Sequence, residues 1–228
     1  MSLKLVVLAD NRAGHRLKGA WAWSINIQFN GKSILFDAGG DPGLLEENAS
    51  MLGVDLRSLD MVILSHHHRD HYGGLKAVAD ASPGITLYVP PGRIGRYKRL
   101  GFNVVMVKKP IWIDRNLLIV GPLYATSVQM YEISLALTYN GKIAVIVGCS
   151  HPGVDRIVSE ALRLTGRKKA TLVIGGFHSP PPEVLQNLAS VAETICPTHC
   201  SGDESRDYLR RHYPEKFCEA FTGSVIEL

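Results

Sequence analysis

The sequence has little that would mark a secreted, membrane-spanning or disulfide-rich protein. Its 228 residues include only four cysteines, and no run reaches the roughly 18 apolar residues of a membrane-spanning helix. The N-terminal apolar stretch is too short for a signal peptide and is followed by no small-residue cleavage site. We therefore expect a cytoplasmic protein whose cysteines are reduced thiols. These are Cys149, Cys196, Cys200 and Cys218.

A strong excess of charge is also missing. The 25 basic and 21 acidic residues leave a net charge of +4, which is scattered along the chain. That is too little to indicate a nucleic-acid-binding protein, although it suits a small anionic substrate. We expect neither nucleic acid nor membrane as a partner, and the sequence predicts no oligomeric state. With 46% apolar residues and 20% charged residues, the composition excludes a disordered, collagenous or coiled-coil chain.

Short apolar runs alternate with helical patterns, which predicts a single layered α/β domain over residues 1–228. Asn30-Gly31 and Asn140-Gly141 between such runs predict two hairpins. The predicted strands are 3–8, 23–29, 33–36, 61–64, 86–89, 103–107, 117–120, 133–139, 143–147 and 171–174. The predicted helices are 42–52, 74–81, 92–100, 154–164, 182–192 and 205–212.

Histidine is the unusual residue of the composition, with nine in the chain and three of them consecutive. His66 and His68 follow the predicted strand 61–64, at the end where ligands gather in α/β sheets. Residues two apart in extended chain point the same way, so these two imidazoles should converge on one ion while His67 points elsewhere. Asp70 and His71 come after a turn and can bind a neighbouring ion. Three imidazoles and a carboxylate suit Zn²⁺, Mn²⁺ or Fe²⁺.

The H-x-H-x-D-H pattern, followed by Gly73-Gly74, resembles the metallo-β-lactamase fold superfamily. The segment 35–39, with Asp37 at its centre, resembles an early motif of the same superfamily. The resemblance implies a four-layer αββα sandwich with one or two metal ions at one edge. It also implies that Asp37, and with it Ser65, orients the metal ligands through hydrogen bonds.

Three further histidines stand near glycine or proline, two of them after the predicted strands 143–147 and 171–174 and the third after Cys196-Pro197-Thr198. They are His151, His178 and His199. We assign His66, His68 and His151 to one ion, and Asp70, His71 and His199 to the second. His178 is either a further ligand or an acid/base group that faces the substrate. His15, His67 and His212 are expected to be bystanders.

The segments around these three histidines resemble a branch of pterin-related synthases of methanopterin-type biosynthesis. The wider superfamily carries a bridging aspartate at one of these strand ends, where residues 148–151 read Gly-Cys-Ser-His. The sequence therefore leaves open which residue stands in for the bridging carboxylate, and whether the chain holds one ion or two.

The resemblance implies a metal-dependent hydrolase in which metal-activated hydroxide attacks a small anionic ester or phosphoester, with Asp70 steering the water. One alternative is a transferase that uses a dihydropterin pyrophosphate, and another is a metal-dependent binding protein without catalysis. Candidate contacts for an anionic substrate lie in the loop after the first strand, at Arg12, Arg16 and Lys18. Aromatic side chains that could stack on a pterin are Trp21, Trp23, Tyr72 and Phe177.

Overall fold

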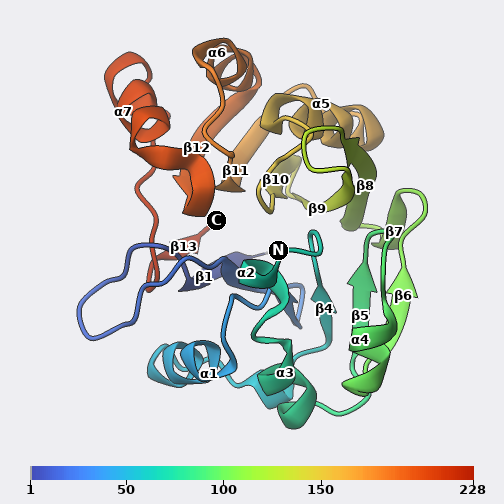
Figure 1. The fold of residues 1–228 in the computed structure, drawn as a ribbon. Coiled ribbons are helices and arrows are strands. Elements are labelled where there is room, and N and C mark those ends of the chain that lie inside the picture. Colours follow the sequence, from blue (N-terminus) through green and yellow to red (C-terminus); the bar gives the residue numbers. More distant parts are fainter. Residues whose placement is uncertain (1) are drawn as a thin grey trace. The chain divides into compact units, whose positions relative to one another are not determined.

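The computed structural model describes residues 2–228 and divides the chain into two compact units. Unit 1 comprises Met1–Val107 with Phe221–Leu228, and unit 2 comprises Lys108–Ala220. Each unit contains one β-sheet with its own helices (Figure 1). Within the described residues, no helix is long and apolar enough to cross a membrane.

The sheet of unit 1 has seven strands in the order β13-β1-β2-β3-β4-β5-β6. β13, β1, β2 and β3 pair antiparallel, whereas β3, β4, β5 and β6 pair parallel. The Asn30-Gly31 turn between β2 and β3 has positive φ at both residues, the conformation of a tight hairpin. The strands are β1 (Leu3–Ala9), β2 (Ser24–Phe29), β3 (Lys32–Phe36), β4 (Met61–Ile63), β5 (Thr86–Val89), β6 (Asn103–Met106) and β13 (Val225–Glu227).

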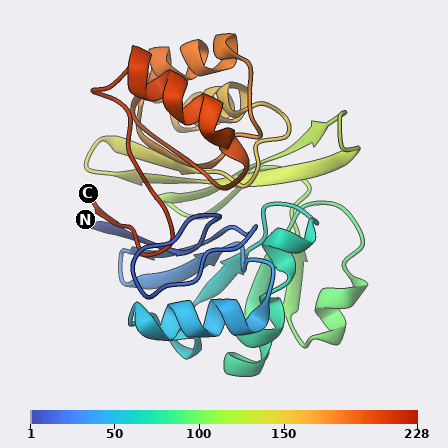
Figure 2. The ribbon, with the colours of Figure 1, turned by 60° about the vertical axis from the view of Figure 1, so that its left-hand side comes forward.

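The helices of unit 1 lie in the connections that parallel strands require. The longest, α1, runs across one face of the sheet, and Figure 2 shows it there. Asp41 caps its N-terminus by accepting a hydrogen bond from the backbone N–H of Leu44. The helices are α1 (Pro42–Met51), η1 (Leu56–Ser58), α2 (Arg69–Tyr72), α3 (Leu75–Ala81) and α4 (Gly95–Arg99).

The sheet of unit 2 has six strands in the order β12-β11-β10-β9-β8-β7. β7 to β10 pair antiparallel in sequence order, and β10, β11 and β12 pair parallel. The strands are β7 (Ile111–Asp114), β8 (Leu117–Ala125), β9 (Met130–Tyr139), β10 (Lys142–Ile146), β11 (Ala170–Gly176) and β12 (Ala192–Thr198).

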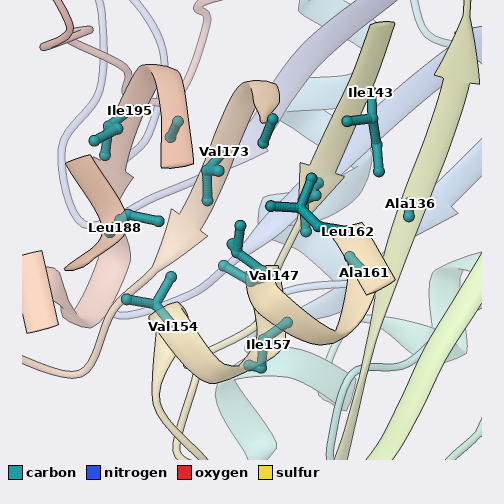
Figure 3. Packing of buried hydrophobic residues seen from close by; sticks show 14 of the residues in the cluster. Ala136, Ile143, Val147, Val154, Ile157, Ala161, Leu162, Val173, Leu188 and Ile195 are labelled. Atoms are coloured by element: carbon teal, nitrogen blue, oxygen red, sulfur yellow. The ribbon is translucent and has the colours of Figure 1, made fainter. Parts of the chain in front are cut away.

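The core of unit 2 is built by α5 against its sheet (Figure 3). Ile157 and Val158 of this helix are buried, together with Ala161 and Leu162 one turn later, as the helical period of the sequence predicts. Gly166 ends the helix in a left-handed conformation. The helices of unit 2 are α5 (Val154–Thr165), α6 (Pro182–Val191), η2 (His199–Ser201) and α7 (Gly202–His212).

The predicted α/β fold class is confirmed. Nine of the ten predicted strands agree within three residues at each end, whereas the strand predicted at 117–120 continues to Ala125 in β8. Three strands were not predicted: β7, β12 and β13. β13 and β7 are only three and four residues long. β12 contains Pro197, which a strand tolerates here because β12 lies at the edge of its sheet. The single domain over the whole chain stays a prediction.

The expectation of four reduced thiols is wrong for two of them. Cys196 and Cys218 form a disulfide with a Cα–Cα distance of 4.5 Å. The segment that contains Cys218 runs beside β12, because the backbone N–H of Cys218 donates to the carbonyl of Ile195. This pairing places the two cysteines side by side across a sequence separation of 22. Cys149 and Cys200 are outside the disulfide, as expected, and both are buried.

Candidate metal-binding site

In both units the candidate metal ligands follow the carboxyl ends of parallel strands. His66 and His68 come after β4 in unit 1. In unit 2, His151 comes after β10, His178 after β11 and His199 after β12. Because parallel strands end at the same edge of a sheet, each unit collects its own polar groups there.

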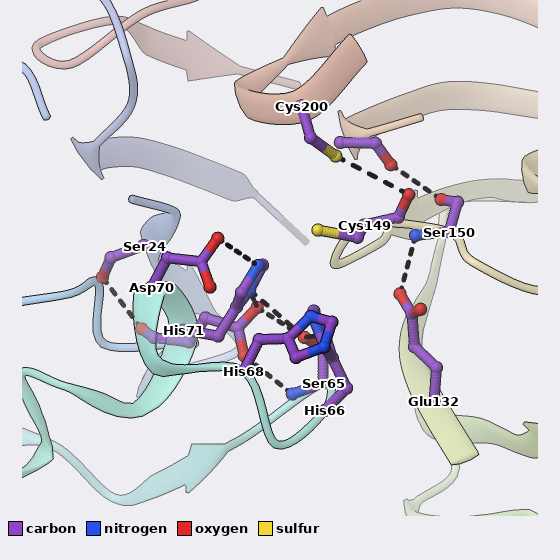
Figure 4. A network of polar contacts seen from close by, with 12 residues as sticks. Ser24, Ser65, His66, His68, Asp70, His71, Glu132, Cys149, Ser150 and Cys200 are labelled. Carbon is purple, nitrogen blue, oxygen red and sulfur yellow. Dashed lines mark hydrogen bonds and ion pairs between the residues drawn. The ribbon is translucent and has the colours of Figure 1, made fainter. Parts of the chain in front are cut away.

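His66 and His68 point toward each other, as the alternation of extended chain predicts. Nε2 of His66 lies 3.1 Å from Nδ1 of His68. His67 turns away, with Nδ1 at 2.8 Å from the hydroxyl of Tyr97 and Nε2 at 3.2 Å from the carbonyl oxygen of Pro90. Burial lowers the pKa of His67. The middle histidine therefore anchors the loop, and its neighbours present their nitrogens together (Figure 4).

Asp37, at the end of β3, holds His71 and Ser65 at once. Its Oδ2 lies 2.6 Å from Nδ1 of His71 and accepts a hydrogen bond from the Ser65 hydroxyl at 2.7 Å. Its Oδ1 accepts from the Ser65 backbone N–H at 2.7 Å. Burial raises the pKa of Asp37, although the bonds to His71 and Ser65 act in the opposite direction. A carboxylate on Nδ1 fixes the histidine tautomer and leaves Nε2 as the electron-pair donor.

Asp70 lies beside that donor nitrogen. Its Oδ2 is 3.7 Å from Nε2 of His71, so an acid and an imidazole of unit 1 face one another. Two glycines allow the chain to pass here. A Cβ at Gly73 would collide with the carbonyl oxygen of Gly40, and a Cβ at Gly74 with that of Ala38. The Gly-Gly pair of the motif therefore serves a close backbone approach.

Glu132 of β9 supports His151 in unit 2, and the sequence reasoning missed it. Oε2 of Glu132 lies 3.0 Å from Nδ1 of His151 and also accepts the His151 backbone N–H. Oε1 accepts the backbone N–H of Ser150 at 2.8 Å. Glu132 is buried, and buried glutamates are rare unless paired. Figure 4 shows its carboxylate facing the backbone of Ser150. An isolated acid within an otherwise apolar strand was the available signal.

His178 and His199 lie close to two thiols. The ligand atoms of Cys149, His151 and His178 lie within 4.8 Å of one another, and so do those of Cys149, His199 and Cys200. A hydrogen bond with Cys149, helped by His178, lowers the pKa of the Cys200 thiol. The bond with Cys200 raises the pKa of His178, which is exposed, whereas His199 is buried.

Several residues at these strand ends have left-handed backbone conformations that non-glycine residues rarely adopt. His178 and His199 have φ angles of 54° and 46°, and Asp37 has a φ of 56°. Ser150, next to His151, has a φ of 60°. Such conformations persist where the surrounding structure enforces them, and they concentrate at functional sites.

The residues predicted to contact the substrate differ in their exposure and in whether their charges are already paired. Lys18 forms an ion pair with Glu47 of α1 at 2.5 Å, so its charge is already matched. Arg16 is exposed and Arg12 is half-buried. Among the aromatic candidates, Trp23 and Phe177 are buried in the interior, Tyr72 carries Arg96 over its ring, and Trp21 is exposed. Trp23 and Phe177 therefore have no exposed face for stacking.

The donor set of each unit fits a divalent transition metal. Unit 1 offers imidazoles and a carboxylate, and unit 2 offers imidazoles and thiols. Both units contain a histidine whose Nδ1 is held by a buried carboxylate, an arrangement typical of metal-binding histidines. Zn²⁺ and Fe²⁺ accept all of these donor types.

Comparisons with known proteins agree with this picture. A family model for the metallo-β-lactamase superfamily matches residues 22–110, which include Asp37 and the histidine run. The chain is 23% identical to 7,8-dihydropterin-6-methyl-4-(β-D-ribofuranosyl)-aminobenzene-5′-phosphate synthase of Methanocaldococcus jannaschii, over 99% of this chain and 97% of that protein.

Solved structures show the same fold. A metal-dependent hydrolase of the β-lactamase superfamily is similar with a TM-score of 0.84 at 21% identity, over 99% of both chains. A diphosphatase from the PhnP family is similar with a TM-score of 0.70 at 17% identity, over 100% of this chain and 98% of that one.

Proposed function

We propose that this chain, of which residues 22–110 match a family model for the metallo-β-lactamase superfamily, is a metal-dependent hydrolase of a small anionic ester or phosphoester. The observation that carries the proposal is the pair of buried carboxylate–histidine contacts, Asp37 with His71 and Glu132 with His151. In each contact one ring nitrogen of the histidine bonds to the carboxylate, and the other nitrogen is left with a lone pair that can bind a metal ion. Hydrolases of this kind need such fixed donors to hold their metal ions.

The ligand assignment proposed from the sequence is kept. One ion is assigned to His66, His68 and His151, and a second ion to Asp70, His71 and His199. Asp37 and Ser65 orient His71 and His66, and we add Glu132 as the residue that orients His151.

A bound divalent ion supplies an electrophile for the ester or phosphoryl oxygen and lowers the pKa of water toward about 7. Side chains of the protein are proposed to orient the water, donate a proton and bind the substrate. We propose that Asp70 orients the attacking water through its carboxylate. His178 is exposed at the end of β11, where it can donate a proton to the leaving group or serve as a further ligand. Arg12 and Arg16 are the proposed contacts for the substrate's negative charge. Lys18, the third basic residue of this loop, is paired with Glu47.

A second candidate is a transferase that acts on a dihydropterin pyrophosphate and an aminobenzene acceptor. It is favoured by the likeness to the Methanocaldococcus jannaschii synthase, which extends over nearly the full length of both proteins. In this reaction the ion would stabilise the departing pyrophosphate, and Trp21 is the exposed aromatic that could contact a pterin ring.

An activity screen of the metal-loaded protein separates the candidates. Simple phosphoesters, phosphodiesters and lactones are tested beside the dihydropterin pyrophosphate with its acceptor. Turnover of simple esters alone supports the hydrolase, and product formation from the pterin pair supports the transferase. A variant of His68 to alanine is the inactive control, and His67→Ala is the matched variant that keeps activity. A protein that holds metal but turns over none of these substrates contradicts both and favours a metal-dependent binding protein.

A further inference from the structure

Cys149 is a buried thiol outside both the disulfide and the main hydrophobic cluster of unit 2. It lies three residues after β10, and only 3% of its surface is exposed. It does not belong to the hydrophobic cluster of unit 2, which runs from Leu118 to Leu209. A buried free cysteine usually behaves as a small apolar side chain. This one is buried among polar groups instead.

Cys149 is the shared member of the two donor groups that unit 2 contains. Its Sγ lies within 4.8 Å of a nitrogen of His151 and of His178, and likewise within 4.8 Å of a nitrogen of His199 and of the Cys200 Sγ. Ligand atoms around one tetrahedral zinc ion at about 2.0 to 2.3 Å are separated by about 3.3 to 3.8 Å, so side-chain shifts of about 1 Å would bring these atoms onto a common ion. No other residue of unit 2 takes part in both groups.

The backbone of β11 is shaped around the thiols of Cys149 and Cys200. A Cβ at Gly176 would lie 2.7 Å from Sγ of Cys200 and 3.3 Å from Cα of Cys149. The backbone N–H of Gly176 donates to the carbonyl of Gly148, which ties the two strand ends together. Ser150 strengthens the tie, because its hydroxyl donates to the carbonyl of Gly176. The thiol of Cys149 is therefore held by a rigid backbone.

We propose that Cys149 is a metal ligand and binds the ion through its sulfur, with imidazole nitrogens of unit 2 as its companions. The inference rests on the proposed metal-dependent function and adds a ligand to it. On binding, the S–H bond of Cys149 gives way to a sulfur–metal bond, and the proton passes to the solvent. No oxidation or reduction is involved.

A thiolate ligand restricts which metal the protein prefers. Sulfur ligands favour zinc, iron and copper(I), whereas manganese and magnesium prefer oxygen ligands. We therefore expect the protein to retain zinc or iron in preference to manganese when the ions compete at equal concentration.

X-ray absorption at the zinc edge of the zinc-loaded full-length protein tests the proposal. A sulfur ligand gives a shell at about 2.3 Å, separate from the nitrogen and oxygen shell at about 2.0–2.1 Å. We expect the sulfur shell in the unmodified protein and its loss in Cys149→Ser. In Cys149→Asp the carboxylate replaces the sulfur, so zinc is retained and the sulfur shell alone disappears.

The matched variant Cys200→Ser decides the question even if the Cys149 variants fail to fold. Cys196 and Cys218 are joined in the disulfide, so a sulfur shell that persists in Cys200→Ser comes from Cys149. If the sulfur shell disappears in Cys200→Ser but remains in Cys149→Ser, the proposal is overturned. If the Cys149 variants do not fold, loss of the sulfur shell in Cys200→Ser alone overturns it. Zinc bound with activity but without sulfur overturns this inference and leaves the proposed function standing. A folded protein that binds no zinc, iron or manganese overturns both.

Discussion

Nδ1 of His71 lies 2.6 Å from Oδ2 of Asp37, and neither side chain is exposed to solvent. The two residues are 34 positions apart, so the contact depends on the parallel pairing of β3 with β4. It determines which nitrogen of His71 is available, and it links the first sheet to the proposed metal chemistry. In unit 2 the contact of Glu132 with His151 has the same form.

Asp37→Asn is expected to weaken metal binding about 10- to 100-fold. An amide cannot act as the carboxylate acceptor for both His71 and Ser65, so the orientation and basicity of His71 are lost. Metal affinity measured by competition with a chelator checks this. Asp60→Asn is the control, because the Asp60 carboxylate accepts a hydrogen bond from the Ser33 backbone on the surface. Equal affinities in Asp37→Asn and the unmodified protein would count against the role of Asp37.

Glu132→Gln should weaken metal binding by a similar factor of about 10 to 100. The glutamate accepts three hydrogen bonds, from the backbone of Ser150 and from the backbone and ring of His151. Glutamine keeps one acceptor oxygen and turns an N–H₂ group toward the other donors. The same chelator competition measures the loss, with the surface variant Glu160→Gln as the control. A change confined to thermal stability, with metal affinity intact, would assign Glu132 a purely structural role.

His68→Ala and His67→Ala should behave differently, although the residues are adjacent. His68 faces His66, so its removal should abolish metal retention, which elemental analysis of the purified variant measures. His67 bonds instead to Tyr97 and Pro90, and its loss leaves the buried Tyr97 hydroxyl without this partner. We expect a cost of about 1–3 kcal/mol in the free energy of unfolding, measured in urea, with metal content unchanged. Equal metal loss in both variants would refute the alternation along the loop.

The protein denatured without reductant should contain two reactive thiols, and four after reduction. The two belong to Cys149 and Cys200, since Cys196 and Cys218 are bonded to each other. A thiol-reactive chromophore counts them directly. Cys218→Ser should also lower the free energy of unfolding by about 3 kcal/mol, because the disulfide closes a loop of 22 residues. Four reactive thiols before reduction would show that the disulfide is absent.

Local periodicity was enough to predict most of the fold and the histidine run. The alternation at His66, His67 and His68 needs only the two-residue period of extended chain, and the buried strands are visible as apolar runs. Asp37 was found because it belongs to a short motif next to a predicted strand. In each case the information lies within a few neighbouring residues.

Contacts that depend on strand register could not be predicted in this way. Glu132 and His151 are 19 residues apart, and only the pairing of β9 with β10 brings them together. The disulfide forms because the segment at Cys218 runs beside β12. β12 was not predicted as a strand because it contains Glu193 and Pro197. Long-range pairing, rather than local propensity, placed these groups.

The parallel strands β10, β11 and β12 have a consequence for how this protein could change during evolution. Neighbouring strands are spaced about 4.8 Å apart, so the distances between the segments that follow them are inherited from the sheet rather than from the loops. The opposite ends of these strands, including the Asn140-Gly141 hairpin, have no part in that spacing. Insertions at those ends can change the length and the surface of the protein while the metal-binding side chains keep their separations. The spacing of the strands therefore sets the distances between the ligand-bearing segments of unit 2.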